Sequence, residues 1–177
     1  MIRAGAILLV AVLMAACEKE EYISPEDQPV YFEYRYVNYA WGYQEHGWLI
    51  DHDGYVRYFE KPDSFRVPDP SGYISIEDLE YNLGQTDSII GQVAENKLTG
   101  YVNNIPGAAS GEIGKSDNIA ADAGSSVLTC YLYDEERESY LKVFLAASGD
   151  WEQFNLSGEA EILVDWLKQY DVFWLSE

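Results

Sequence analysis

The sequence predicts an α+β domain in which an antiparallel sheet is packed by two or three helices. Residues 30–59 contain three stretches rich in β-branched and aromatic residues, separated by turn sequences, which indicates a three-stranded meander. Residues 126–146 show this pattern again as a later hairpin. Residues 157–170 space their apolar side chains as a helix does. Strands grouped apart from helices are typical of the α+β class.

The meander begins with a predicted strand over residues 30–43, whose two faces are both rich in aromatic side chains. Alternation therefore does not indicate which face is buried. Residues 44–47 are predicted to form a turn, and residues 48–50 begin the second strand. Residues 51–54 end in Asp-Gly, which favours a tight hairpin because glycine accepts a positive φ angle. The third strand covers residues 55–59.

Two helices are expected after the meander. Residues 61–72 contain three prolines and are predicted to form a loop, and Ser75 is expected to cap a short helix. Residues 103–126 are predicted to form a long irregular segment. Between them, Thr86 or Asp87 is expected to cap a second helix, whose apolar residues lie on or near one face: Ile89, Ile90, Val93, Leu98 and Val102.

The last part of the chain is predicted to add a hairpin and a helix. The hairpin pairs residues 126–133 with residues 139–146, and residues 148–156 are expected to form a loop. Ser157 is predicted to cap the last helix, whose first turns carry acids that the helix dipole favours. Residues 171–175 are expected to be a terminal strand or tail.

The N-terminus has the layout of a secretory signal peptide. Arg3 supplies a positive charge, residues 4–14 are apolar, and Ala15 and Ala16 are small residues at the cleavage position. The apolar run is too short to span a bilayer as a stable helix. We expect residues 1–16 to be removed; the alternative is a short membrane anchor that is never cut.

Residues 14–17, Met-Ala-Ala-Cys, resemble a bacterial lipobox, in which the cysteine becomes the mature N-terminus. The resemblance implies that the Cys17 sulfur carries a diacylglycerol and its amine a further acyl chain. Several chains are needed for stable anchoring, so the membrane is the implied partner of Cys17. The alternative is a secreted protein in which Cys17 pairs or stays free.

Residues 18–21, Glu-Lys-Glu-Glu, resemble the surface-export signal of Bacteroidota lipoproteins. Residue 18 is not Asp, so the inner-membrane retention signal of enteric bacteria is absent. The chain thus resembles the small lipoproteins of unknown function common in Bacteroidota, which implies no activity. It implies an outer-membrane location facing the cell exterior, and the alternative location is the periplasmic leaflet. The alternative interpretation of residues 18–21 is a solvated acidic linker with no export role.

The chain is therefore expected to have three parts. Residues 1–16 are the signal peptide, residues 17–29 are the lipidated cysteine and an acidic tether, and residues 30–177 form a single globular α+β domain. The mature chain carries ten basic and thirty-one acidic residues, because Arg3 is the one charged residue of the signal. This negative charge argues against nucleic acid and anionic lipid head groups as partners.

No motif identifies a catalytic residue, a metal site or a cofactor, and we expect neither a metal nor a cofactor. Residues 51–54 hold two acids and a histidine but lack the ligand spacing of a calcium loop. With Cys17 as the anchor, Cys130 stands alone in an apolar run and is predicted to be a buried, inert thiol. Thirty-one acids could supply a glycosidase pair in any fold, and the sequence does not indicate which pair.

The aromatic residues suggest a ligand-binding surface, since the chain has fifteen Tyr, six Phe and five Trp. The alternative is that these rings fill the core of the sheet and its covered face. A contiguous exposed patch would favour the ligand-binding surface. The predicted platform, whose rings would stack on sugars, consists of Tyr34, Tyr36, Trp41, Tyr43 and Trp48.

Residues 87–89, Asp-Ser-Ile, resemble the three-residue O-glycosylation motif of Bacteroidota. The resemblance implies a glycan on the Ser88 hydroxyl, and Ser88 is expected to be exposed at the start of a helix.

Two functions of different classes follow from these observations. The first is a non-catalytic surface lipoprotein that binds a macromolecular partner, glycan or protein, through the aromatic meander or residues 103–126. The second is an extracellular or periplasmic hydrolase that acts through carboxylates the sequence does not identify. A deep cleft with two acids of raised pKa would favour the hydrolase, and a flat aromatic patch would favour the binding protein.

Overall fold

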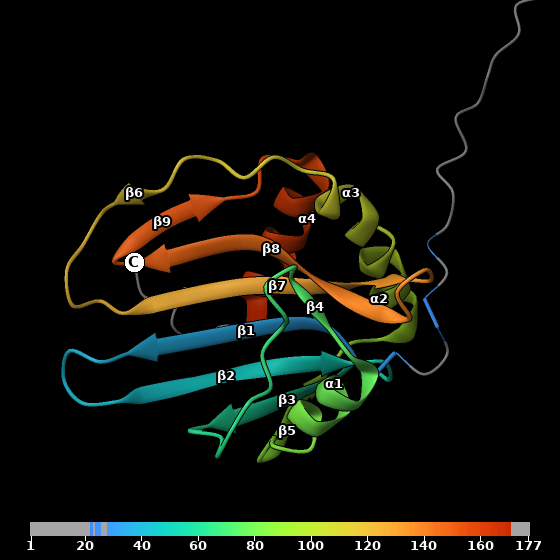
Figure 1. Ribbon diagram of the computed structural model, residues 1–177, viewed down its shortest axis with the longest axis horizontal. Coiled ribbons are helices and arrows are strands. Elements are labelled where there is room, and N and C mark those ends of the chain that lie inside the picture. The colour runs from blue at the N-terminus through green and yellow to red at the C-terminus, as the bar shows by residue number, and fades with distance from the viewer. Residues whose placement is uncertain (1–21, 23, 26–27, 171–177) are drawn as a thin grey trace, which may run out of the picture.

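The computed structural model describes residues 22, 24–25 and 28–170, and it confirms the α+β class. One antiparallel sheet of nine strands has the order β5-β3-β2-β1-β7-β8-β9-β6, and β4 pairs with β8 (Figure 1). The predicted terminal element at 171–175 lies outside the described residues.

The predicted meander and the later hairpin are both present, and they form the centre of the sheet. Their strands are β1 (Val30–Asn38), β2 (Gln44–Asp51), β3 (Tyr55–Glu60), β7 (Ser125–Asp134) and β8 (Ser139–Gly149). β1 pairs with β7, with Phe32 opposite Cys130. This pairing joins segments about a hundred residues apart into one sheet.

The predicted second helix is wrong in its first half. Ser88–Gln92 forms β5, an edge strand that pairs with β3, and the helix α2 covers only Glu95–Val102. The β-branched Ile89 and Ile90 suit a strand, and the backbone groups of β3 supply hydrogen bonds that a helix would make locally.

The predicted irregular segments also contain regular structure. Residues 103–126 hold a short helix, α3 (Ile105–Ala109), and a two-residue strand, β6 (Asp117–Asn118). The predicted loop at 148–156 holds β9 (Trp151–Phe154), which pairs with β8 and β6. These short elements are stabilised by partners distant in sequence, so local composition did not reveal them.

Both serine caps are confirmed. The Ser75 hydroxyl accepts a hydrogen bond from the Asp78 amide at 3.1 Å and begins α1 (Ile76–Leu83). Ser157 does the same for the Ala160 amide at 3.1 Å and begins α4 (Gly158–Leu167), which continues into a 3₁₀ turn at Lys168–Tyr170. Each cap satisfies a backbone donor that a helix leaves free at its start.

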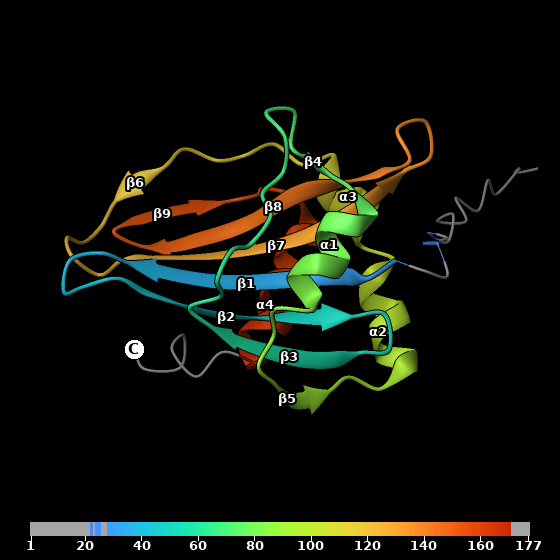
Figure 2. The same cartoon turned by 60° about the horizontal axis from the view of Figure 1, so that its bottom comes forward.

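The two faces of the sheet are covered differently, as Figures 1 and 2 show. We call the face under α2, α3 and α4 the back face, and the face under α1 and β4 (Tyr73–Ile74) the front face. The back face holds the larger apolar core, which includes Phe32, Trp48, Leu128, Leu163 and Trp166. The smaller front core includes Leu49, Phe59, Leu79, Tyr131 and Tyr140.

Part of the predicted tether is packed on the domain. Gln28 is fully buried, and its side-chain amide donates to the carbonyls of Val30 and Tyr131 at 3.0 and 3.1 Å. Tyr22 is also held against the domain. The stretch that can act as a free tether is therefore shorter than residues 17–29.

Candidate functional site

The structure divides the five residues of the predicted aromatic platform. Tyr34 and Trp48 are 1% and 3% exposed, and their rings stack at 5.6 Å within the back core. The prediction that they contact a ligand is therefore wrong. They are buried because α4 and the 3₁₀ turn after it cover the back face, toward which Tyr34 of β1 and Trp48 of β2 point.

The exposed rings gather at the turn between β1 and β2. Trp41 is 80% exposed and Tyr43 46%, and Tyr39, which the predicted platform omitted, is 74% exposed. The rings of Tyr39 and Tyr43 lie 5.3 Å apart. We call Tyr39, Trp41 and Tyr43 the aromatic tip. Sequence reasoning extended the strand through this turn and so assigned these residues to faces that they do not have.

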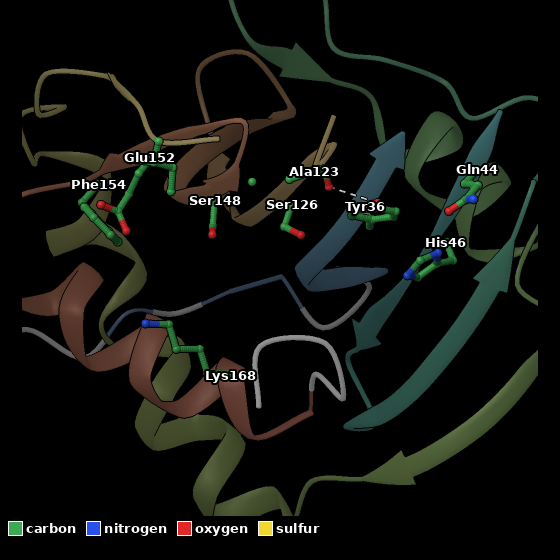
Figure 3. A pocket seen from close by; sticks show the side chains of 11 residues that line it. Tyr36, Gln44, His46, Ala123, Ser126, Ser148, Glu152, Phe154 and Lys168 are labelled. Atoms are coloured by element: carbon green, nitrogen blue, oxygen red, sulfur yellow. Dashed lines mark hydrogen bonds between the residues drawn. The ribbon is translucent and has the colours of Figure 1, made fainter. Parts of the chain in front are cut away.

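The fifth platform residue, Tyr36, lines a pocket of about 540 Å³ on the back face beyond the end of α4 (Figure 3). Its ring lies 4.8 Å from that of His46, and its hydroxyl donates to the Ala123 carbonyl at 3.1 Å. Figure 3 shows Glu152 and Lys168 on the side opposite Tyr36 and His46. Of the described residues that line this pocket, Glu152 is the one carboxylate, so they include no acid pair.

A second hollow runs along β1 and β7 on the front face, and we call it the front groove. It consists of two adjoining cavities of about 350 and 510 Å³, which share Val37 and Ser125. Its inner end is lined by Glu33, Arg35, Thr129 and Lys142, and its outer end by Tyr39, Asp122, Asp150 and Trp151. Trp151 is 55% exposed, and sequence reasoning missed it because residues 148–156 were expected to form a loop.

The inner end of the front groove is charged. Glu33 accepts hydrogen bonds from the Lys142 ammonium at 2.8 Å and from the Tyr131 hydroxyl. Burial alone would raise the pKa of Glu33, but the charge and hydrogen bond of Lys142, together with Tyr131, outweigh it and hold the pKa below its usual value. Glu33 is therefore ionised at neutral pH and unsuited to act as a general acid.

The floor of the front groove carries polar atoms that the described residues leave without partners. The Thr129 hydroxyl is one of them, and Thr129 is 5% exposed. Arg35 pairs with Glu45 through a terminal guanidinium nitrogen, while its Nε atom makes no hydrogen bond to a described residue. Both atoms are closed to solvent, so the hydrogen-bonding groups that the groove offers a ligand are the partly exposed side chains of Arg35 and Lys142.

The structure also shows the burial and position of Cys130 and Ser88, two other residues that the sequence singled out. Cys130 is fully buried and burial raises the pKa of its thiol, so it is the inert thiol that the sequence predicts. Ser88 is exposed, but on the edge strand β5 and not at a helix start. The described residues contain no cluster of three side chains that could hold a metal ion.

The chain matches no protein-family model, no curated protein and no solved structure. In the part of the chain that the structure describes, no helix has the length and apolar character needed to cross a bilayer.

Proposed function

We propose that this protein is an outer-membrane lipoprotein, anchored through Cys17, that binds a neutral glycan at the front groove without altering it chemically. Its domain faces the cell exterior; attachment to the periplasmic leaflet is the alternative. The observation that carries the binding proposal is the placement of exposed aromatic rings, Tyr39 and Trp151, at the open end of a polar groove.

The chemistry of the front groove suits a sugar chain. Exposed aromatic rings offer flat apolar faces for the C–H faces of sugar rings, and rings of this size are otherwise rarely left in water. The partly exposed charged groups of Arg35 and Lys142 supply hydrogen bonds for sugar hydroxyl groups. The net charge of −20 repels polyanions, which favours a neutral chain.

The described residues support binding more than hydrolysis. A glycosidase needs two carboxyl groups, one of which is kept protonated by its surroundings. Glu33 at the inner end of the front groove is instead kept ionised by Lys142. The outer end holds two acids, Asp122 and Asp150, and the Asp150 carboxylate already accepts a hydrogen bond from the Ala123 amide at 2.8 Å. In the pocket on the back face that Tyr36 lines, Glu152 is the one carboxylate among the described residues.

Titration calorimetry against neutral oligosaccharides tests this proposal, with the mature chain carrying Cys17→Ser so that it is free of lipid. Tyr39→Ala and Trp151→Ala are each expected to weaken binding about tenfold or more, because each removes an exposed ring that lines the groove. Ile162→Ala is the matched control, since Ile162 is similarly exposed but lies on α4, which covers the back face.

Three results would count against the proposal. Unchanged binding by both the Tyr39 and the Trp151 variant would place the site elsewhere. New reducing ends in the reaction mixture would make the protein a hydrolase. Binding of a protein partner, sensitive to the same two variants and with no glycan bound, would assign the groove to protein recognition.

A further inference from the structure

The segment that leads from the proposed lipid anchor into the domain is held at one end of the molecule. The Tyr22 amide donates to the Asn103 side-chain oxygen at 3.2 Å, and the Tyr133 amide donates to the Tyr22 hydroxyl at 2.9 Å. The Ser24 and Tyr31 hydroxyls lie 2.7 Å apart. Burial raises the pKa of Tyr22 to about 12, so its hydroxyl is neutral at physiological pH.

The distance from the anchor to this docking point is short. Five residue steps separate Cys17 from Tyr22, and a fully extended chain of that length reaches at most about 18 Å. A lipid on Cys17 therefore keeps the end of the domain that holds Tyr22 close to the bilayer surface.

The strands run away from this end. β1 begins at Val30, beside the docked segment, and its nine residues span about 30 Å before the aromatic tip. The turn between β7 and β8, at residues 135–138, lies at the same end as Tyr22, because β7 runs antiparallel to β1. Figures 1 and 2 both show the turn that follows β1 at the opposite end of the sheet from α2 and the β7–β8 turn.

We infer that the domain stands on the membrane with the Tyr22 end down and the aromatic tip outward. This inference rests on the lipid anchor of the proposed function. The near end includes the β7–β8 turn, where Glu135, Glu136 and Glu138 outnumber Arg137. Such a turn is repelled by anionic head groups and stays outside the bilayer. The aromatic end of the front groove then opens away from the membrane, toward large ligands.

Energy transfer to the membrane tests this orientation. The lipidated mature protein, which begins at Cys17, is placed in phosphatidylcholine vesicles that carry an acceptor dye on a lipid head group. A donor dye is attached through Glu136→Cys at the near end or Ala40→Cys at the far end, both of which are exposed positions. Cys130 is buried and does not compete for the dye.

Transfer from position 136 is expected to be several-fold more efficient than transfer from position 40, since the two ends are separated by about the length of β1, ~30 Å. Equal transfer, or stronger transfer from position 40, would overturn the orientation while leaving the anchor intact. Failure of the protein to float with the vesicles would overturn the anchor, and the orientation with it.

A variant that undocks Tyr22 tests whether this contact fixes the orientation of the domain. Tyr22→Ala removes both the ring and the hydroxyl that hold the segment to Tyr133. The free tether then lengthens, and the transfer efficiencies at positions 136 and 40 are expected to converge while the domain stays folded by circular dichroism. Tyr81→Ala, on the exposed side of α1, is the tyrosine control that should leave the difference unchanged. An unchanged difference in Tyr22→Ala would show that Tyr22 does not fix the orientation.

Discussion

At the scale of single residues, the front face contains a buried carboxylate, Glu33, whose charge is neutralised by a neighbouring lysine. Glu33 is 3% exposed and depends on Lys142 and Tyr131 for its hydrogen bonds. Removing one partner of a buried ion pair leaves the other charge without compensation, which costs more than the pair contributes. Lys142 therefore matters to stability although its side chain is partly exposed.

Lys142→Met is expected to lower the free energy of unfolding by about 3 kcal/mol at neutral pH, because Glu33 stays buried without its cation. Urea unfolding measures the change. Lys97→Met is the matched control, since it removes the same charge from an exposed position and should change stability by less than about 0.5 kcal/mol. Equal effects of the two substitutions would mean that the ion pair does not stabilise the fold.

The ion pair of Glu33 and Lys142 also makes the stability of the fold depend on pH in the acid range. The pKa of Glu33 is lower in the folded protein than its ordinary value of 4.5, so folding favours the ionised carboxylate. This contribution is present above pH 4.5 and is lost as the pH falls below it, toward the pKa of the folded protein. In Lys142→Met the loss on acidification, followed by urea unfolding at several pH values, should be smaller because the stabilising cation is already gone.

At the scale of elements, the centre of the sheet depends on close approach between strands. A Cβ atom on Gly47 in β2 would overlap the Tyr34 carbonyl oxygen and would lie 2.7 Å from the Phe59 ring. Gly100 in α2 has the opposite surroundings, with open space within 4 Å of its would-be Cβ atom. Gly47 therefore has no room for a side chain, whereas Gly100 does.

Gly47→Ala is expected to destabilise the protein by about 2–3 kcal/mol through overpacking against backbone. Gly100→Ala is expected to stabilise it by about 0.5–1 kcal/mol, because alanine loses less backbone entropy in a helix. Thermal and urea unfolding measure both, and each variant serves as the control for the other. A stabilised Gly47→Ala would contradict the strand packing described above.

At the scale of the whole molecule, the proposed function depends on how the chain is attached and which end is free. The docked Tyr22 end and the exposed aromatic tip lie at opposite ends of β1. An anchor at Cys17 therefore makes the aromatic end of the front groove the part of the domain farthest from the lipid. Both the anchor and the side of the membrane are open to direct measurement.

Protease accessibility on intact cells is expected to show digestion of the wild type without lysis, because we propose that the domain faces outward. Cys17→Ala is expected to leave the membrane fraction, since it removes the proposed site of lipidation. Protection of the wild type until lysis would place the domain in the periplasm. A wild type that is released from the membrane would show that Cys17 carries no lipid.

Most of the central sheet and both serine caps could be predicted because their signals are local. Turn residues such as Gly54 and caps such as Ser157 act through their own backbone and the next few residues. The strand β5 could not be predicted, because Ile89 and Ile90 fit a helix face or an edge strand equally until β3 is placed beside them. The groove residue Trp151 was missed for the same reason, since β9 depends on partners far along the chain.

The sequence by itself determined the composition, the charge and the grouping of strands and helices, since these follow from residue types and their spacing. Only the tertiary structure decided which aromatic rings are exposed. β1 carries rings on both faces, and Tyr34 is buried because distant helices pack on its face, whereas Tyr39 is exposed because β1 ends before it in a turn. The tertiary structure also decided that Tyr22 docks, because its partners Asn103 and Tyr133 lie far along the chain.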